Sequence, residues 1–70
     1  MNDKSNKMND KEKLQVEITR VRLVLSQVEY SGAQVRAAMI RFKVREAGRV
    51  LLMGNEEQAQ RATKELEGIV

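Results

Sequence analysis

Cationic side chains recur at every second position between residues 40 and 46, where Arg41, Lys43 and Arg45 alternate with apolar residues. On a β-strand these three cations would point to one face, about 7 Å apart, which is near the spacing of successive phosphates on one nucleic-acid strand. Arginine suits phosphate binding because its planar guanidinium donates two parallel hydrogen bonds. The pattern predicts a phosphate-binding surface, and the alternative is the solvated outer face of a half-buried strand.

Further arginines extend this surface if their segments lie beside the strand in a sheet. The candidate nucleic-acid-binding residues are Arg20, Arg22, Arg36, Arg41, Lys43, Arg45 and Arg49. Tyr30 and Phe42 are the only aromatic residues, so we expect contacts to the phosphate backbone and little stacking on bases. The prediction depends on residues 40–45 being extended, because a helix would spread their cations around its circumference.

Composition argues against an enzyme. The 70 residues include no Cys and no His, which removes thiolate chemistry, the commonest metal ligand and the side chain that titrates near neutral pH. Phosphate-binding loops, dinucleotide fingerprints and zinc or calcium motifs are also missing from the sequence. We therefore expect no cofactor, no metal site and no small-molecule substrate.

The elements that position the cations follow from periodicity. Strict alternation over 40–45, a turn at 46–48 and the apolar run 50–53 predict a β-hairpin over about 40–53. Asn55 has the features of a helix N-cap, with two Glu residues after it and Gln58 three positions on. A C-terminal helix over about 56–69 follows. The predicted class is α+β, a small antiparallel sheet with a C-terminal helix.

Residues 14–39 leave two interpretations open. The apolar residues of 14–28 recur at helical spacing, yet the same stretch also alternates as a strand does. Ser31 and Gly32 suit a hairpin turn, or a helix stop followed by a helix whose capping box runs from Ser31 to Gln34. The alternative fold is an all-α three-helix unit with Gly32, Gly54 and Gly68 directly after its helices.

Residues 1–12 are polar and predict a mobile N-terminal arm, followed by one small domain over 13–70. A domain of this size without disulfides or metals is marginally stable alone, so we expect a homo-oligomer.

The main functional hypothesis is a small basic protein that binds nucleic acid, either DNA or RNA. The alternative is a protein–protein adaptor or a self-assembling subunit. No membrane-spanning stretch is present in the sequence, and a cytoplasmic location is expected.

Overall fold

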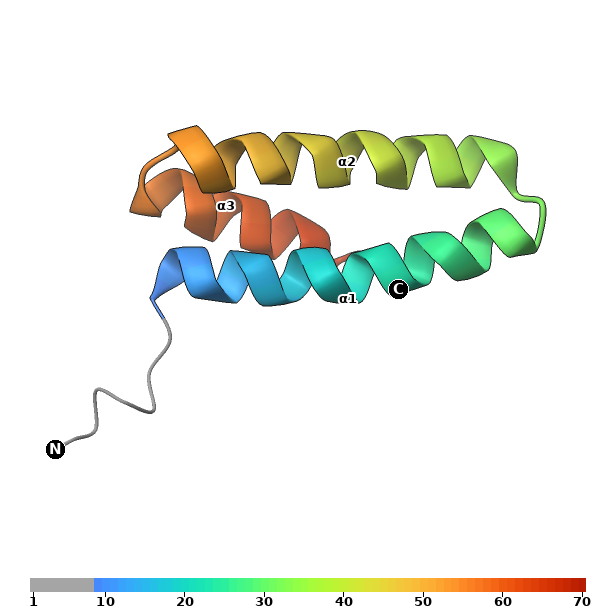
Figure 1. Cartoon of the computed structure of the whole chain (residues 1–70), viewed down its shortest axis with the longest axis horizontal. Coiled ribbons are helices and arrows are strands. Elements are labelled where there is room, and N and C mark those ends of the chain that lie inside the picture. Colours follow the sequence, from blue (N-terminus) through green and yellow to red (C-terminus); the bar gives the residue numbers. More distant parts are fainter. Residues whose placement is uncertain (1–8) are drawn as a thin grey trace, which may run out of the picture.

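Three α-helices account for nearly all of residues 9–70, the part of the chain that the computed structural model describes (Figure 1). They are α1 (Asp10–Tyr30), α2 (Gln34–Met53) and α3 (Glu56–Glu67). Residues 9–70 contain no strand, so the predicted α+β class and the hairpin over 40–53 are wrong. The all-α three-helix alternative describes the architecture correctly.

α1 and α2 form an antiparallel helical hairpin joined by a short turn (Figure 1). Gly32 has a φ of 84°, the left-handed conformation that favours glycine. The Ala33 amide donates to the Val28 carbonyl oxygen at 3.3 Å, and the Gly32 amide donates to the Glu29 carbonyl oxygen at 3.1 Å. This pair of bonds is a Schellman motif, which ends α1 and turns the chain into α2.

Ser31 is the C-cap of α1, and α2 begins after Ala33 without a side-chain cap. The capping box predicted from Ser31 to Gln34 is therefore wrong. The Ser31 hydroxyl instead donates backwards, to the Val28 carbonyl oxygen at 2.7 Å. The glycine-led helix stop was the stronger local signal, because only glycine enters the left-handed conformation at little cost.

The predicted start of the C-terminal helix is confirmed. The Asn55 side chain accepts a bond from the Gln58 amide at 2.9 Å, and the Gln58 side chain accepts from the Asn55 amide at 3.1 Å. These reciprocal bonds form the expected capping box. The helix ends at Glu67, with Gly68 as its C-cap, two residues before the predicted end.

The core lies where the three helices meet, and each helix packs against the other two. It consists of side chains spaced three or four residues apart on each helix, with alanines that allow close approach. The buried residues are Leu14, Ile18 and Val21 of α1, Ala37, Ile40, Val44 and Ala47 of α2, and Ala59, Thr63 and Leu66 of α3. The buried Thr63 hydroxyl is satisfied by the Ala59 carbonyl oxygen at 2.8 Å.

The hairpin prediction failed because it required Ile40, Phe42 and Val44 to be buried together on one face of a strand. No helical face includes Ile40, Val44, Met39 and Phe42 together, and the structure leaves Met39 and Phe42 60% and 63% exposed. Residues 14–28, for which the sequence left strand and helix open, belong to the helix α1. Val16, Leu23 and Tyr30 lie on its exposed side, while its helical stripe faces the core.

The predicted arm, residues 1–12, lies mostly outside the described residues. Its last three residues, 10–12, form the first turn of α1, capped by reciprocal bonds between Asn9 and Glu12. Within residues 9–70, no helix is both long enough and apolar enough to cross a membrane.

Candidate nucleic-acid interface

The helix divides the three cations that a strand would have aligned. Successive helical residues are rotated by 100°, so Lys43 lies about 160° from both Arg41 and Arg45 on the circumference of α2. Arg41 and Arg45, four residues apart, remain on one side. The predicted Arg-rich sheet face is therefore wrong, and Lys43 does not share a surface with the two arginines that flank it in sequence.

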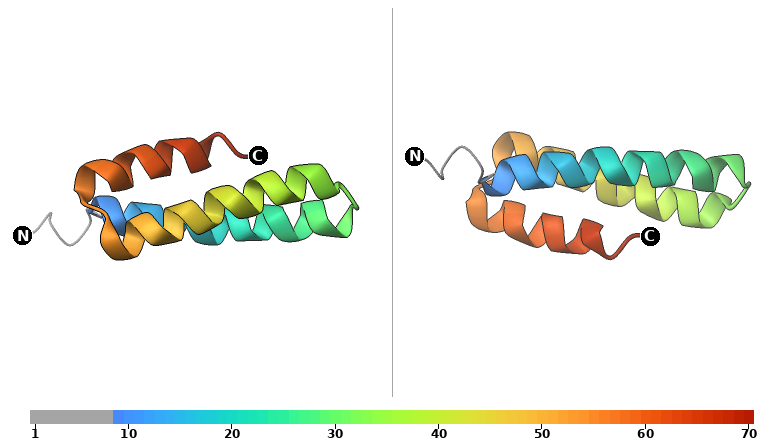
Figure 2. Two further views of the ribbon diagram at one scale, coloured as in Figure 1. Left: turned by 90° about the horizontal axis from the view of Figure 1, so that it is seen from above. Right: turned by 90° about the horizontal axis from the view of Figure 1, so that it is seen from below.

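Arg22, Arg41 and Arg45 line one hollow between α1 and α2. Its other lining residues are Leu25, Ala38, Phe42 and Val44, so no carboxylate and no residue of α3 lines it. Figure 2 shows α3 on one side of the α1–α2 hairpin. Arg49 follows Arg45 by one further turn of α2. We call Arg22, Arg41, Arg45 and Arg49 the arginine face.

Three members of the arginine face make no ion pair with any residue of 9–70, and the fourth makes one. Arg22, Arg45 and Arg49 are exposed and have no carboxylate partner in that range. Arg41 donates from Nη2 to Glu29 Oε2 at 3.0 Å, with its side chain 58% exposed. An exposed pair of this kind is weak, about 0–1 kcal/mol, so an anion competes for Arg41 at small cost.

The remaining predicted site residues contact α3 and the residues that follow it. Arg20 donates from Nη2 to the Leu66 carbonyl oxygen at 2.9 Å and from Nε to Glu17 Oε1 at 2.9 Å. The Leu66 carbonyl belongs to the last turn of α3 and also accepts from the Ile69 amide at 2.9 Å, so Arg20 adds a side-chain bond at this helix end. Arg20 therefore acts as a structural C-terminal cap of α3.

Arg36 and Lys43 also lie beside α3 and the residues that follow it. Arg36 Nη2 donates to the main-chain oxygen of Val70, and Lys43 Nζ lies 4.0 Å from Glu65 Oε1. Together with Arg20, they form a second set of cations on the side of the hairpin that α3 covers. The seven predicted residues thus divide into an arginine face of four and a structural group of three.

The sequence did contain the signal for the arginine face. Arg41, Arg45 and Arg49 are spaced by four residues, which places them along one side of a helix. The alternation with apolar residues obscured this spacing, because both periods fit the same short segment. No group of three or more potential metal-ligating side chains occurs within the part of the chain that the structure describes.

Comparisons with protein-family models, with curated proteins and with solved structures gave no significant match.

Proposed function

We propose that the protein is a non-enzymatic nucleic-acid-binding protein that contacts the phosphate backbone through the arginine face. The observation that supports this proposal most directly is the hollow lined by Arg22, Arg41 and Arg45 with no carboxylate among its lining residues. Arg22 and Arg45 make no ion pair within residues 9–70, and the Arg41 pair with Glu29 is exposed and weak, so a polyanion can engage all three cations. A phosphate chain is the ligand whose charge repeats along its length.

The dimensions of the arginine face suit a backbone ligand. Arg41, Arg45 and Arg49 extend over about 12 Å of the α2 axis, at a rise of 1.5 Å per residue. Arg22 adds a cation from α1, so the surface has width as well as length. Phe42 is the only aromatic side chain beside these arginines, which favours contacts to phosphates over stacking on several bases.

The experiment compares two double variants that remove the same charge. Arg45→Ala with Arg49→Ala changes the arginine face, whereas Arg61→Ala with Lys64→Ala changes exposed cations of α3. Fluorescence anisotropy with labelled duplex DNA and with single-stranded RNA measures both. We expect the first variant to weaken binding about tenfold or more and the second to change it only slightly. Equal losses would mean that net charge alone, and no particular surface, is responsible.

A protein–protein adaptor or self-assembling subunit is the second candidate. Large apolar side chains remain exposed on both long helices, among them Val16, Leu23, Met39 and Phe42. Contiguous exposed apolar surface is typical of association sites. Sedimentation velocity across a range of protein concentrations tests the proposed homo-oligomer, which a concentration-independent monomer would exclude.

A cytoplasmic location remains part of the proposal, and the absence of Cys is compatible with it.

A further inference from the structure

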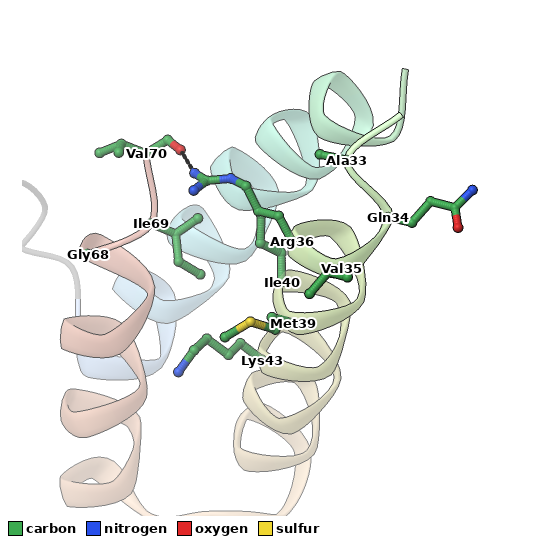
Figure 3. Close-up of a pocket in the computed structure, with 10 residues that line it drawn as sticks. All are labelled: Ala33, Gln34, Val35, Arg36, Met39, Ile40, Lys43, Gly68, Ile69 and Val70. Carbon is green, nitrogen blue, oxygen red and sulfur yellow. Dashed lines mark hydrogen bonds between the residues drawn. The ribbon is translucent and has the colours of Figure 1, made fainter. Parts of the chain in front are cut away.

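An apolar groove of about 690 Å³ lies between the first half of α2 and the residues that follow α3. Val35, Met39 and Ile40 line it from α2, and Ile69 and Val70 line it from the other side. Figure 3 shows Met39, Ile40 and Ile69 projecting into the space between the two segments, whereas Gln34 points away. Val35 and Val70 are 78% and 83% exposed, so the surface is uncovered in this chain.

The groove exists because α3 is shorter than the hairpin on which it packs. α3 has 12 residues and α2 has 20, so about 12 Å of the hairpin extends beyond α3. The Arg36 bond to the Val70 main-chain oxygen holds the segment after α3 against α2, which forms the second wall (Figure 3). Arg36, which the sequence analysis placed among the candidate nucleic-acid-binding residues, therefore holds this wall of the groove in position.

The apolar surface continues along α2 past the groove. Met39 and Lys43 also line a second hollow with Ala38 and Phe42. Val35, Met39 and Phe42 are spaced by four and three residues, which places them in one stripe along the outer side of α2. A stripe of this spacing is complementary to the apolar stripe of another helix lying along it.

The charge of α2 as a whole is strongly one-sided. α2 carries five cations, Arg36, Arg41, Lys43, Arg45 and Arg49, against the single carboxylate Glu46. Arg36 and Lys43 line the groove itself. Arg36 bonds to the main-chain oxygen of Val70, and Lys43 lies 4.0 Å from Glu65 Oε1 in an exposed pair, which is weak and which another carboxylate can replace at small cost. The rim of this apolar surface therefore favours acidic side chains.

We propose that the groove and the stripe formed by Val35, Met39 and Phe42 bind an acidic amphipathic helix of a partner protein. Its apolar residues, at i, i+3 or i+4, and i+7, would pack on the stripe and against Ile69, while its carboxylates meet Arg36 and Lys43. Phe42 also lines the hollow beside Arg41 and Arg45, but the groove itself contains no member of the arginine face, so this inference does not depend on phosphate binding.

The same observations argue against two other occupants. A second copy joined through this groove would bring Arg36 and Lys43 of one chain toward the same two cations of the other, which is unfavourable at an interface. A small metabolite would need several polar groups converging on it. Among residues 9–70, Arg36 and Lys43 are the only charged side chains that line the groove, and most of the remaining lining is apolar.

The test uses a labelled, helix-forming peptide of about 12 residues with leucines at i, i+3, i+4 and i+7 and glutamates elsewhere. A scrambled peptide of the same composition is its control. Val35→Glu with Met39→Glu introduces charge into the groove, and Val16→Glu with Leu23→Glu introduces the same charge on exposed positions of α1. Methyl-labelled Met provides an internal comparison, because Met39 lines the groove and Met53 ends α2 at the opposite end of the hairpin.

We expect the peptide to shift the Met39 methyl signal and leave the Met53 signal unchanged. We expect the α2 variant to weaken peptide binding at least about tenfold and the α1 variant to weaken it about twofold or less. Equal binding of the scrambled peptide, or equal losses in the two variants, would overturn the proposal. A concentration-dependent dimer that the α2 variant abolishes would also overturn it, since the surface would then belong to a second copy.

Discussion

Arg45 lies one helical turn beyond Arg41 on α2, and both side chains line the same hollow with Arg22 from α1. This relationship exists only because residues 40–45 are helical. It replaces the alignment of Arg41, Lys43 and Arg45 that a strand would have produced, and it transfers Lys43 to the side that faces α3.

Neutralising Glu29 should strengthen nucleic-acid binding. Glu29→Gln removes the carboxylate that pairs with Arg41 at 3.0 Å, which leaves Arg41 available to a phosphate. The free energy of unfolding should change by less than about 1 kcal/mol, because the pair is exposed. Glu67→Gln, at an exposed position of α3, makes the same change in net charge and is the control. Anisotropy measurements should show a gain of about twofold or more for the first variant relative to the second.

Replacing Arg20 should destabilise the fold without a specific effect on binding. Arg20→Met retains much of the aliphatic side chain and loses the bonds to the Leu66 carbonyl oxygen and to Glu17. We expect the free energy of unfolding, measured by urea denaturation, to fall by about 1–2 kcal/mol. Nucleic-acid affinity at a temperature where the variant is folded should fall no further than it does in Lys64→Ala. A large specific loss would place Arg20 in the binding surface after all.

Two Gly→Ala substitutions should have opposite effects on stability. Gly48 lies within α2, and a Cβ built there meets no atom within 4 Å. Gly48→Ala should therefore raise the free energy of unfolding by about 0.5–1 kcal/mol. Gly32 has a φ of 84°, so Gly32→Ala should lower it by about 1–2 kcal/mol. Thermal denaturation of the two variants side by side checks both signs, and a destabilised Gly48→Ala would contradict the packing described for α2.

Removing the cap of α3 should weaken the fold by a predictable amount. Asn55→Ala loses the side-chain acceptor for the Gln58 amide, at a cost of about 1 kcal/mol. Asn55→Gly is the control, because glycine at an N-cap costs only a few tenths of a kcal/mol. Chemical denaturation should rank the wild type above Asn55→Gly and Asn55→Gly above Asn55→Ala.

Local signals in the sequence predicted the C-terminal element well. Asn55 and Gln58 specify a helix start through bonds between neighbouring residues, and these bonds need no tertiary information. The glycines at 32, 54 and 68 likewise follow the three helices, as the all-α alternative requires. Features determined by bonds between near neighbours are therefore predictable from this sequence.

The exposure of Phe42 and Met39 to solvent was not predictable from local signals. Both are large and apolar, so the sequence favoured a structure that buries them, and only a strand accommodated Phe42 beside Ile40 and Val44. In the structure the core is filled by Ile40 and Val44 together with residues of α1 and α3, and Phe42 remains exposed. Which apolar residues the core has room for depends on the packing of all three helices.

The separation of the cations into the arginine face and the group beside α3 also depends on how the three helices pack, so the sequence did not predict it. Whether Arg20, Arg36 and Lys43 are available to a ligand depends on where α3 ends and which carbonyls or carboxylates it presents to them. Those contacts join residues about 20 to 50 positions apart in the chain, at separations that periodicity does not address. The four-residue spacing of Arg41, Arg45 and Arg49 was the part of the site that the sequence alone contained.

The salt dependence of binding shows whether the arginine face contacts phosphates. The dissociation constant for a labelled DNA duplex should be measured across a series of KCl concentrations for the wild type and for Arg45→Ala with Arg49→Ala. If the arginine face contacts phosphates, the slope of log affinity against log salt should fall in magnitude by about 2 in the variant, one for each lost contact. An unchanged slope, or wild-type binding that is insensitive to salt, would mean that the arginine face does not bind phosphates.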